Sequence, residues 1–167
     1  AFGANISCSA DSSFVFSDGS GPLFSIGAEN TFNVKANGGV RFWTTADHSS
    51  NIGTRLAAGG SSWVALSDST KKTNRIPVDS KAILQKVAAL PIDQWNYKHQ
   101  ADGPLHIGPM AQDYWKAFHL GEDSLGIETI DADGVLFAAV QELAKQNAEL
   151  KQTNDKQTSE ILNSSSW

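Results

Sequence analysis

Residues 1–66 alternate short apolar and polar positions, and turn-forming residues separate the alternating pieces. This alternation has the period of a half-buried strand, and each gap carries Gly, Asn or Asp. The gaps recur at intervals of roughly ten residues, which indicates a loose internal repeat. The pieces that we expect to be strands are residues 14–16, 23–26, 31–35 and 40–44.

This first part holds few aliphatic residues and no helical pattern that would cover an apolar face. Repeats of this kind usually bury their apolar side chains against a neighbouring copy, in the same chain or in another. We therefore expect residues 1–66 to be a β-stranded stalk that intertwines with other chains, like a triple β-helix or β-prism. An ordinary small β-sandwich is the alternative. Because the chain begins inside this pattern, we also expect it to be part of a longer protein.

The pattern changes after residue 66. Apolar residues at helical spacing follow a Pro-Val-Asp-Ser run, with Asp79 or Ser80 as the expected N-cap. Pro91 ends this helix, because proline removes a backbone donor and clashes with the preceding turn. Residues 92–98 then alternate like a strand.

A second amphipathic helix is expected to run through Met110 and Phe118, with Gly121 closing it. Residues 125–130 are expected to be a further short strand. Residues 67–133 therefore predict a compact α+β module.

The last part of the chain keeps one heptad register, with steps of four and three residues. Amides buried in such a seam fix register and oligomer number at some cost in stability. We expect residues 134–167 to be a long helix, capped by Asp133, that forms a trimeric coiled coil and ends in a frayed tail. The alternative is that its first turns fold back on residues 67–133. The seam comprises Leu136, Val140, Leu143, Asn147, Leu150, Asn154, Gln157 and Ile161.

Composition narrows the function classes. The net charge of −5 argues against a nucleic-acid surface, which is usually basic. No apolar run approaches the roughly 20 residues that span a bilayer. One cysteine offers neither a disulfide nor a metal cluster, and residues 131–134 lack the further ligands of a calcium loop. We expect no cofactor and no metal.

The junction between the first two parts holds the candidate chemistry. Ser67 and Lys72 lie five residues apart, as a candidate nucleophile and base. A lysine can accept a proton once burial and nearby cations disfavour its ammonium form. A polar, solvated turn is the alternative for this spacing. His106 is a candidate orienting group, and the alternative for it is a packed structural residue.

Four segments in order resemble the intramolecular chaperone domain of phage endosialidases, the S74 self-cleaving peptidase family. The first is residues 66–74, LSDSTKKTN, and the resemblance covers about residues 63–150. The other three are residues 90–98 (LPIDQWNYK), 106–113 (HIGPMAQD) and 130–134 (IDADG). Residues 1–66 are similar to the β-repeat stalks that precede this domain in tail fibres.

The resemblance implies a homotrimer that folds its own N-terminal fibre as a client and then cuts itself off. It maps the catalytic serine and lysine onto Ser67 and Lys72, and thus the scissile bond onto Leu66–Ser67. Asp68 and Asn74 match supporting motif positions. Thr70 departs from the pattern, because many members carry arginine there, which would slow cleavage.

The same resemblance places the protein in a virion tail fibre or a cell-surface fibre, encoded by a phage or a prophage-like bacterial gene. Two other functions stay open. One is an uncleaved trimeric fibre tip in which the serine and lysine are inert. The other is a glycan- or receptor-binding adhesin that uses Phe42, Trp43 and the exposed loops of the first part.

Overall fold

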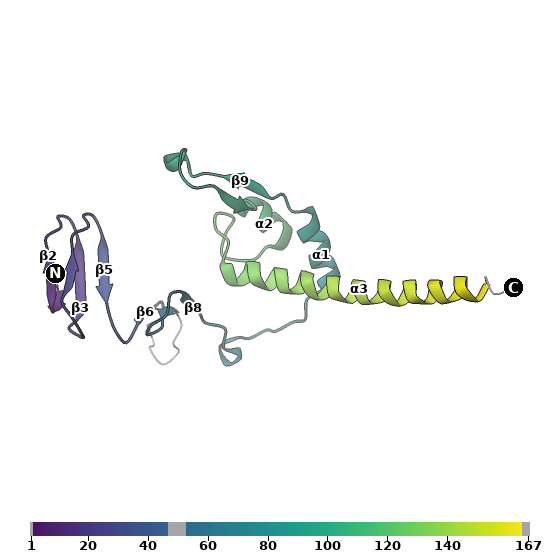
Figure 1. Ribbon diagram of the computed structural model, residues 1–167, viewed down its shortest axis with the longest axis horizontal. Helices are drawn as coiled ribbons and strands as arrows, with labels where there is room; N and C mark the ends of the chain where they lie inside the picture. Colours follow the sequence, from purple (N-terminus) through teal and green to yellow (C-terminus); the bar gives the residue numbers. More distant parts are fainter. Residues whose placement is uncertain (1, 47–52, 165–167) are drawn as a thin grey trace. The chain divides into compact units, whose positions relative to one another are not determined.

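The computed structural model describes residues 2–46 and 53–164 (Figure 1). The chain is mixed α+β, with short strands first, a small α+β region next and a long helix at the end. It divides into two units, Ala1–Asn74 and Arg75–Trp167, and each is described by itself.

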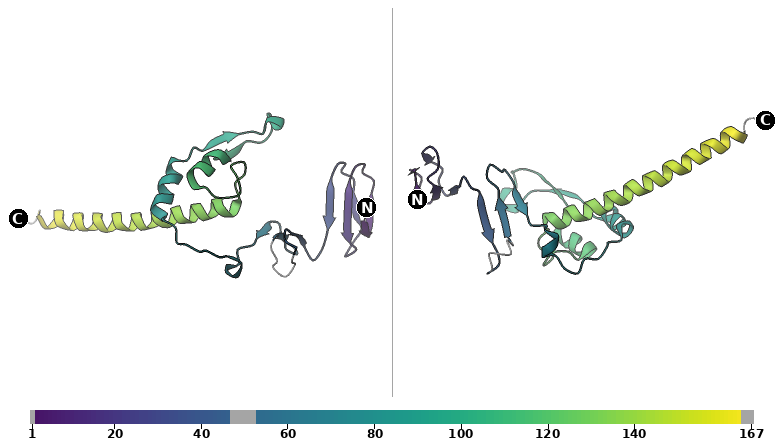
Figure 2. Two further views of the ribbon diagram at one scale, coloured as in Figure 1. Left: turned by 180° about the vertical axis from the view of Figure 1, so that it is seen from behind. Right: turned by 90° about the horizontal axis from the view of Figure 1, so that it is seen from below.

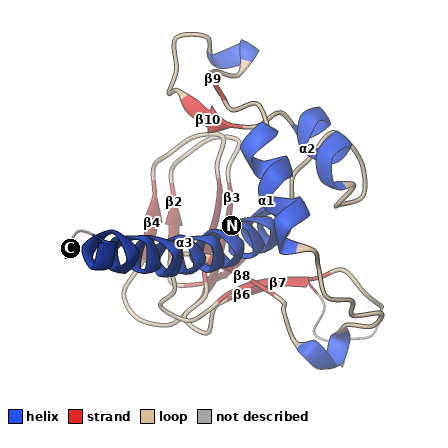
Figure 3. Cartoon of the chain, turned by 90° about the vertical axis from the view of Figure 1, so that its right-hand side faces the viewer, coloured by secondary structure: helices blue, strands red, loops and turns tan. Residues whose placement is uncertain are grey.

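The first unit opens with two parallel sheets of very short strands. One sheet has the order β1-β3-β5. The other pairs β2 with β4, which lie side by side in Figure 3. The strands expected over residues 14–16, 23–26 and 31–35 are confirmed with small shifts in their ends. The described residues form no closed β-helix. The five strands are β1 (Phe2–Ala4), β2 (Ile6–Cys8), β3 (Phe14–Asp18), β4 (Phe24–Ile26) and β5 (Phe32–Lys35).

The structural repeat in these sheets contains two strands, one from each sheet. Ile6 pairs with Phe24, and Phe14 pairs with Phe32, so equivalent positions of successive repeats lie directly above one another. The Phe14 and Phe32 rings stack with centroids 4.7 Å apart. The shorter interval inferred from the sequence therefore separates single strands and not repeats.

An antiparallel sheet follows, with the order β6-β7-β8. Its strands are β6 (Val40–Trp43), β7 (Gly53–Leu56) and β8 (Trp63–Ala65). Gly53 has φ of 144°, and a Cβ there would lie 1.9 Å from the carbonyl oxygen of Phe42. This pairing therefore requires glycine, because any side chain would push β6 and β7 apart.

The second unit begins with α1 (Ser80–Ala89), and the predicted cap is confirmed because the Asp79 carboxylate accepts from the Ala82 N–H at 3.0 Å. An antiparallel hairpin follows, formed by β9 (Asp93–Trp95) and β10 (His106–Gly108). The expected strand over residues 92–98 is thus shorter than predicted.

The helix α2 (Ala111–Phe118) follows the hairpin. Its C-cap is His119, which has a left-handed backbone with φ of 53°. The prediction that Gly121 closes this helix is therefore wrong. The described residues also include the 3-10 turns η2 (Ser69–Lys71) in the first unit and η3 (Lys98–Gln100) in the second.

The long helix α3 spans Thr129–Ser164. The strand predicted for residues 125–130 is wrong, since bends and the start of α3 occupy those positions. Asp133 does not cap the helix because it lies inside it, and the helix starts before residue 134. The expected frayed tail lies partly outside the described residues, and Ser164 is still helical.

The helix α1 packs against the first half of α3 (Figures 1 and 2). The buried residues of α3 recur at helical spacing on one face and are Val135, Ala138, Ala139 and Glu142. Glu142 is 5% exposed, and its carboxylate accepts from the Ser80 hydroxyl at 3.1 Å and from the Gln146 amide at 2.8 Å. The first turns of α3 thus do fold onto the preceding module, as the alternative proposed.

Candidate site at the Leu66–Ser67 bond

A capped turn follows directly on the edge strand β8. The Asp68 carboxylate accepts from the backbone N–H of Thr70 at 2.8 Å and from its hydroxyl at 2.9 Å. These two hydrogen bonds, with a smaller contribution from nearby Lys71, lower the pKa of the Asp68 carboxyl below its usual value. The capping aspartate therefore initiates η2 immediately after the predicted scissile bond.

The turn brings Lys72 back to Ser67. The ammonium group of Lys72 donates a hydrogen bond to the Ser67 hydroxyl, with Nζ and Oγ 2.8 Å apart. Both residues are exposed, so water has access to the pair. The geometry suits proton transfer from a hydroxyl to an amine, which needs a heavy-atom distance of about 2.6–3.2 Å. The lysine must first lose its proton to act as a base.

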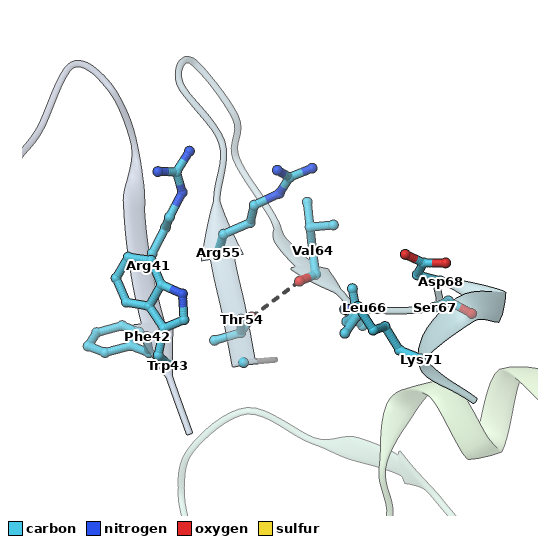
Figure 4. Close-up of a pocket in the computed structure, with 12 residues that line it drawn as sticks. Arg41, Phe42, Trp43, Thr54, Arg55, Val64, Leu66, Ser67, Asp68 and Lys71 are labelled. Atoms are coloured by element: carbon cyan, nitrogen blue, oxygen red, sulfur yellow. Dashed lines mark hydrogen bonds between the residues drawn. The ribbon is translucent and has the colours of Figure 1, made fainter. Parts of the chain in front are cut away.

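The Leu66–Ser67 peptide bond lies beside a hollow of about 530 Å³ (Figure 4). One wall is the β6-β7-β8 sheet and the other is the segment from Leu66 to Lys71. The Thr54 hydroxyl donates to the carbonyl of Val64 at 3.4 Å within it. The charged residues that line the hollow are Arg41, Arg55, Asp68 and Lys71.

Sequence reasoning missed the two arginines of this hollow. Arg41 and Arg55 lie directly opposite each other on β6 and β7. The alternation of Val40-Arg41-Phe42-Trp43 placed Arg41 on a strand, but the local pattern does not indicate which strand pairs with it or in what register.

His106 lies in the second unit, on β10. Its ring stacks on Trp95 with centroids 4.6 Å apart and packs edge-on against Tyr97 at 5.5 Å. These contacts give His106 a structural setting, and its supporting role at Ser67 stays a prediction. Asn74 ends the first unit with φ of 52°, and its role is also a prediction.

The heptad seam of α3 lies on a different face from the one that packs against α1. Its apolar members Leu136, Val140, Leu143, Leu150 and Ile161 are each more than half exposed. From Asn147 to Ser164 every residue of the helix is exposed, as its projection beyond α1 in Figure 1 indicates. A helix with one buried face and a second, exposed apolar stripe is equipped for two packing partners.

The capped turn with its serine–lysine pair opens the segment of the chain that a known family model matches. Residues 67–120 match the Peptidase S74 family model, described as chaperone of endosialidase, and the first matched residue is Ser67. This segment is therefore an S74 domain, of a family of self-cleaving peptidases. No curated protein and no solved structure matches the chain.

No helix in the described part of the chain is long and apolar enough to cross a membrane. Within the same residues, no three His, Cys, Asp or Glu side chains are grouped closely enough to hold a metal ion.

Proposed function

We propose that this chain is an intramolecular chaperone that trimerises, folds its own N-terminal fibre and releases itself by cutting the Leu66–Ser67 bond. The observation that carries the proposal is the 2.8 Å contact between Lys72 Nζ and Ser67 Oγ at the first residue of the S74 domain. The client is residues 1–66, and the assembled fibre belongs to a phage virion or a cell surface.

The reaction follows from the order of groups along the chain. Neutral Lys72 takes the proton of the Ser67 hydroxyl, and Oγ attacks the carbonyl carbon of Leu66. The Leu66–Ser67 C–N bond breaks, the Ser67 nitrogen leaves as an amine, and the Leu66 acyl group stays on Oγ as an ester. Water then hydrolyses the ester and restores the hydroxyl. Attack on the adjacent peptide makes the step intramolecular, so proximity is supplied by the chain itself.

Trimerisation is supported by the surface that one chain leaves exposed. The apolar residues of the α3 seam are each more than half exposed in one chain, so they can pack against the same seam of other copies. Two amides of the seam, Asn147 and Asn154, are separated by one heptad, and we assign to them the choice of register and oligomer number.

Assembly would also switch on the chemistry. In a single chain both members of the pair are exposed to water. Packing of other copies around the turn would remove water from the amine and favour its neutral form. Cleavage would then report that the trimer has formed, and the freed fibre would be trapped behind a high barrier to unfolding.

The test is a mass spectrum of the freshly expressed protein, combined with light scattering. We expect two products, residues 1–66 and 67–167, and a trimer before cleavage. Ser67→Ala should give one intact chain of 167 residues that still trimerises, whereas Ser69→Ala, a matched change two residues on, should cleave normally. An intact wild-type trimer would contradict the proposed cleavage, and a monomer would contradict the whole proposal.

An uncleaved fibre tip is the second candidate function. It is favoured by the exposure of both Ser67 and Lys72, since a solvated lysine is a poor base. The same experiment separates the two, because an uncleaved tip is a stable trimer of full-length chains.

A further inference from the structure

The hollow beside the scissile bond carries an excess of positive charge. Arg41, Arg55 and Lys71 line it, and Asp68 is the one carboxylate among its lining residues. The part of the chain before the scissile bond holds three Lys and Arg residues in all, so two of the three lie in this hollow. This concentration suggests a binding role for the two arginines.

The arginines occupy an unfavourable arrangement in the uncut chain. Arg41 faces Arg55 directly across β6 and β7, and Arg55 faces Val64 directly across β7 and β8. Residues that are directly opposite share one face of a sheet, and like charges in such a pair are destabilising. Within residues 2–46 and 53–164, no acidic side chain forms an ion pair with either guanidinium group. An anion placed between or beside them would reverse the sign of this interaction.

Cleavage creates such an anion. Hydrolysis adds water across the Leu66–Ser67 bond, so Leu66 gains a carboxylate and Ser67 gains an amine. Leu66 comes directly after the last residue of β8 and lines the same hollow as Arg55. It follows Val64 by two residues, which span about 7 Å of extended chain, and an arginine side chain has several rotatable bonds with which to cover such a distance. In the uncut chain the Leu66 carbonyl is neutral, and the side chains of Arg41 and Arg55 extend away from the Leu66 side chain (Figure 4).

We propose that Arg55, supported by Arg41, binds the carboxylate that cleavage creates on Leu66 and thereby fastens the end of β8. This inference rests on the proposed function, because the ligand exists only after the cut.

The binding has a structural purpose. The strand β8 has three residues and lies at the edge of its sheet, with β7 as its one partner. Release of the S74 domain removes Asp68 and Lys71 and leaves this short strand with a free end, which would fray. A carboxylate held by a guanidinium fork is a charge-assisted contact and restrains both the end and its orientation. The new carboxylate also replaces the negative charge that Asp68 takes away.

The test compares the same substitution before and after cleavage. Arg55→Gln is made in the self-cleaving chain and in the uncut Ser67→Ala chain, and the unfolding rate of each assembled trimer is measured at a fixed, raised temperature. In the cut trimer we expect Arg55→Gln to unfold about three times faster, the scale of a partly exposed ion pair. In the uncut trimer we expect unfolding to be unchanged or slower, because like-charge repulsion is relieved.

Two variants sharpen this test. Arg55→Lys should recover part of the effect in the cut trimer, since it keeps the charge and loses the fork. Lys35→Gln removes the remaining cation of the client, whose ammonium donates to the Pro22 carbonyl at 2.7 Å outside the hollow. Its effect should be the same in cut and uncut trimers.

A second measurement needs no variant of the arginines. Leu66 is labelled with ¹³C at its carboxyl carbon, and the pKa of the new carboxylate in the cut trimer is measured by NMR titration. This pKa should lie below the range of about 3.3–3.7 that is usual for a chain terminus. A normal titration, or equal effects of Arg55→Gln in cut and uncut trimers, would overturn this inference and leave the proposed function intact. If the wild-type chain is not cut, both fail.

Discussion

Ser67 and Ser80 each contact a charged side chain through the serine hydroxyl, and the two contacts differ in almost every physical respect. Ser67 accepts a hydrogen bond from Lys72, five residues away and 2.8 Å distant, and both residues are exposed. Ser80 donates to Glu142, which lies 62 residues away at 3.1 Å and is 5% exposed.

The two contacts differ in what must fold before each can form. The contact of Ser67 needs only the local turn η2, so a single chain forms it without any long-range packing. The contact of Ser80 forms only when α1 docks on α3, so it reports that the second unit has folded. A pair that forms within one turn is exposed to water on its own. In the proposed cleavage reaction, other parts of the chain or other copies must therefore remove water from Lys72.

The largest expected effect is on the local contact, with Lys72→Arg. Arginine keeps the positive charge and the ability to donate to Ser67, but it does not lose its proton in proteins. We expect cleavage to fall at least about 100-fold, the lower end of what a positioned base contributes. The trimer should be unaffected, as measured by light scattering beside a time course of cleavage on denaturing gels.

Lys71→Arg is the matched control, one residue before Lys72, and should cleave at a rate close to that of the wild type. Equal cleavage by Lys72→Arg and the wild type would show that the lysine acts only as a charge.

A smaller effect is expected at the long-range contact, with Glu142→Gln. The pKa of the Glu142 carboxyl is lowered mainly by the Gln146 amide and also by the Ser80 hydroxyl and nearby lysines. A lowered pKa in the folded state gives stability that is present above the ordinary glutamate value of about 4.3 and is lost as the pH falls below it. The wild-type second unit should therefore lose thermal stability on acidification.

Glu142→Gln should lower the melting temperature by a few degrees at pH 7 and flatten the dependence between pH 5 and 3. Circular dichroism of the α3 helix measures both, in the Ser67→Ala background so that no cleavage intervenes. A variant with the slope of the wild type would show that other carboxyls control the acid response.

The smallest effect is expected from Thr70→Val. This change keeps the shape of the side chain and removes the hydroxyl that donates to Asp68 at 2.9 Å. The backbone N–H of Thr70 still caps the turn, so we expect cleavage to slow only a few-fold, as measured by the gel time course. A loss as large as that of Lys72→Arg would mean that the hydroxyl takes part in the reaction itself.

Local features of the fold could be predicted from the sequence. Asp79 caps α1 as expected, because the N-cap depends only on residues within one turn. The spacing of Ser67 and Lys72 identified a pair that the structure brings into hydrogen-bond contact. Asp133 was misplaced because α3 begins earlier, at Thr129, where no strong capping residue marks the start.

Features that depend on register or distant packing could not be predicted in this way. The facing arginines follow from the pairing of β6 with β7, which a one-residue slip would have abolished. The burial of Glu142 depends on the docking of α1, and a charged residue in a heptad helix normally suggests a solvated position. The two-strand repeat could not be predicted because the alternation is the same in every strand and does not show which strands pair, such as β3 with β5.

The pairing of Phe14 with Phe32 and of Ile6 with Phe24 makes residues 2–35 modular. A whole two-strand block could be duplicated or deleted without changing the phase in which the chain arrives at the antiparallel sheet. Half a block would put a strand of the β2-β4 sheet where a strand of the β1-β3-β5 sheet belongs. The length of this β-stranded segment can thus vary in whole repeats without any change to the strand pairing that precedes Leu66 and Ser67.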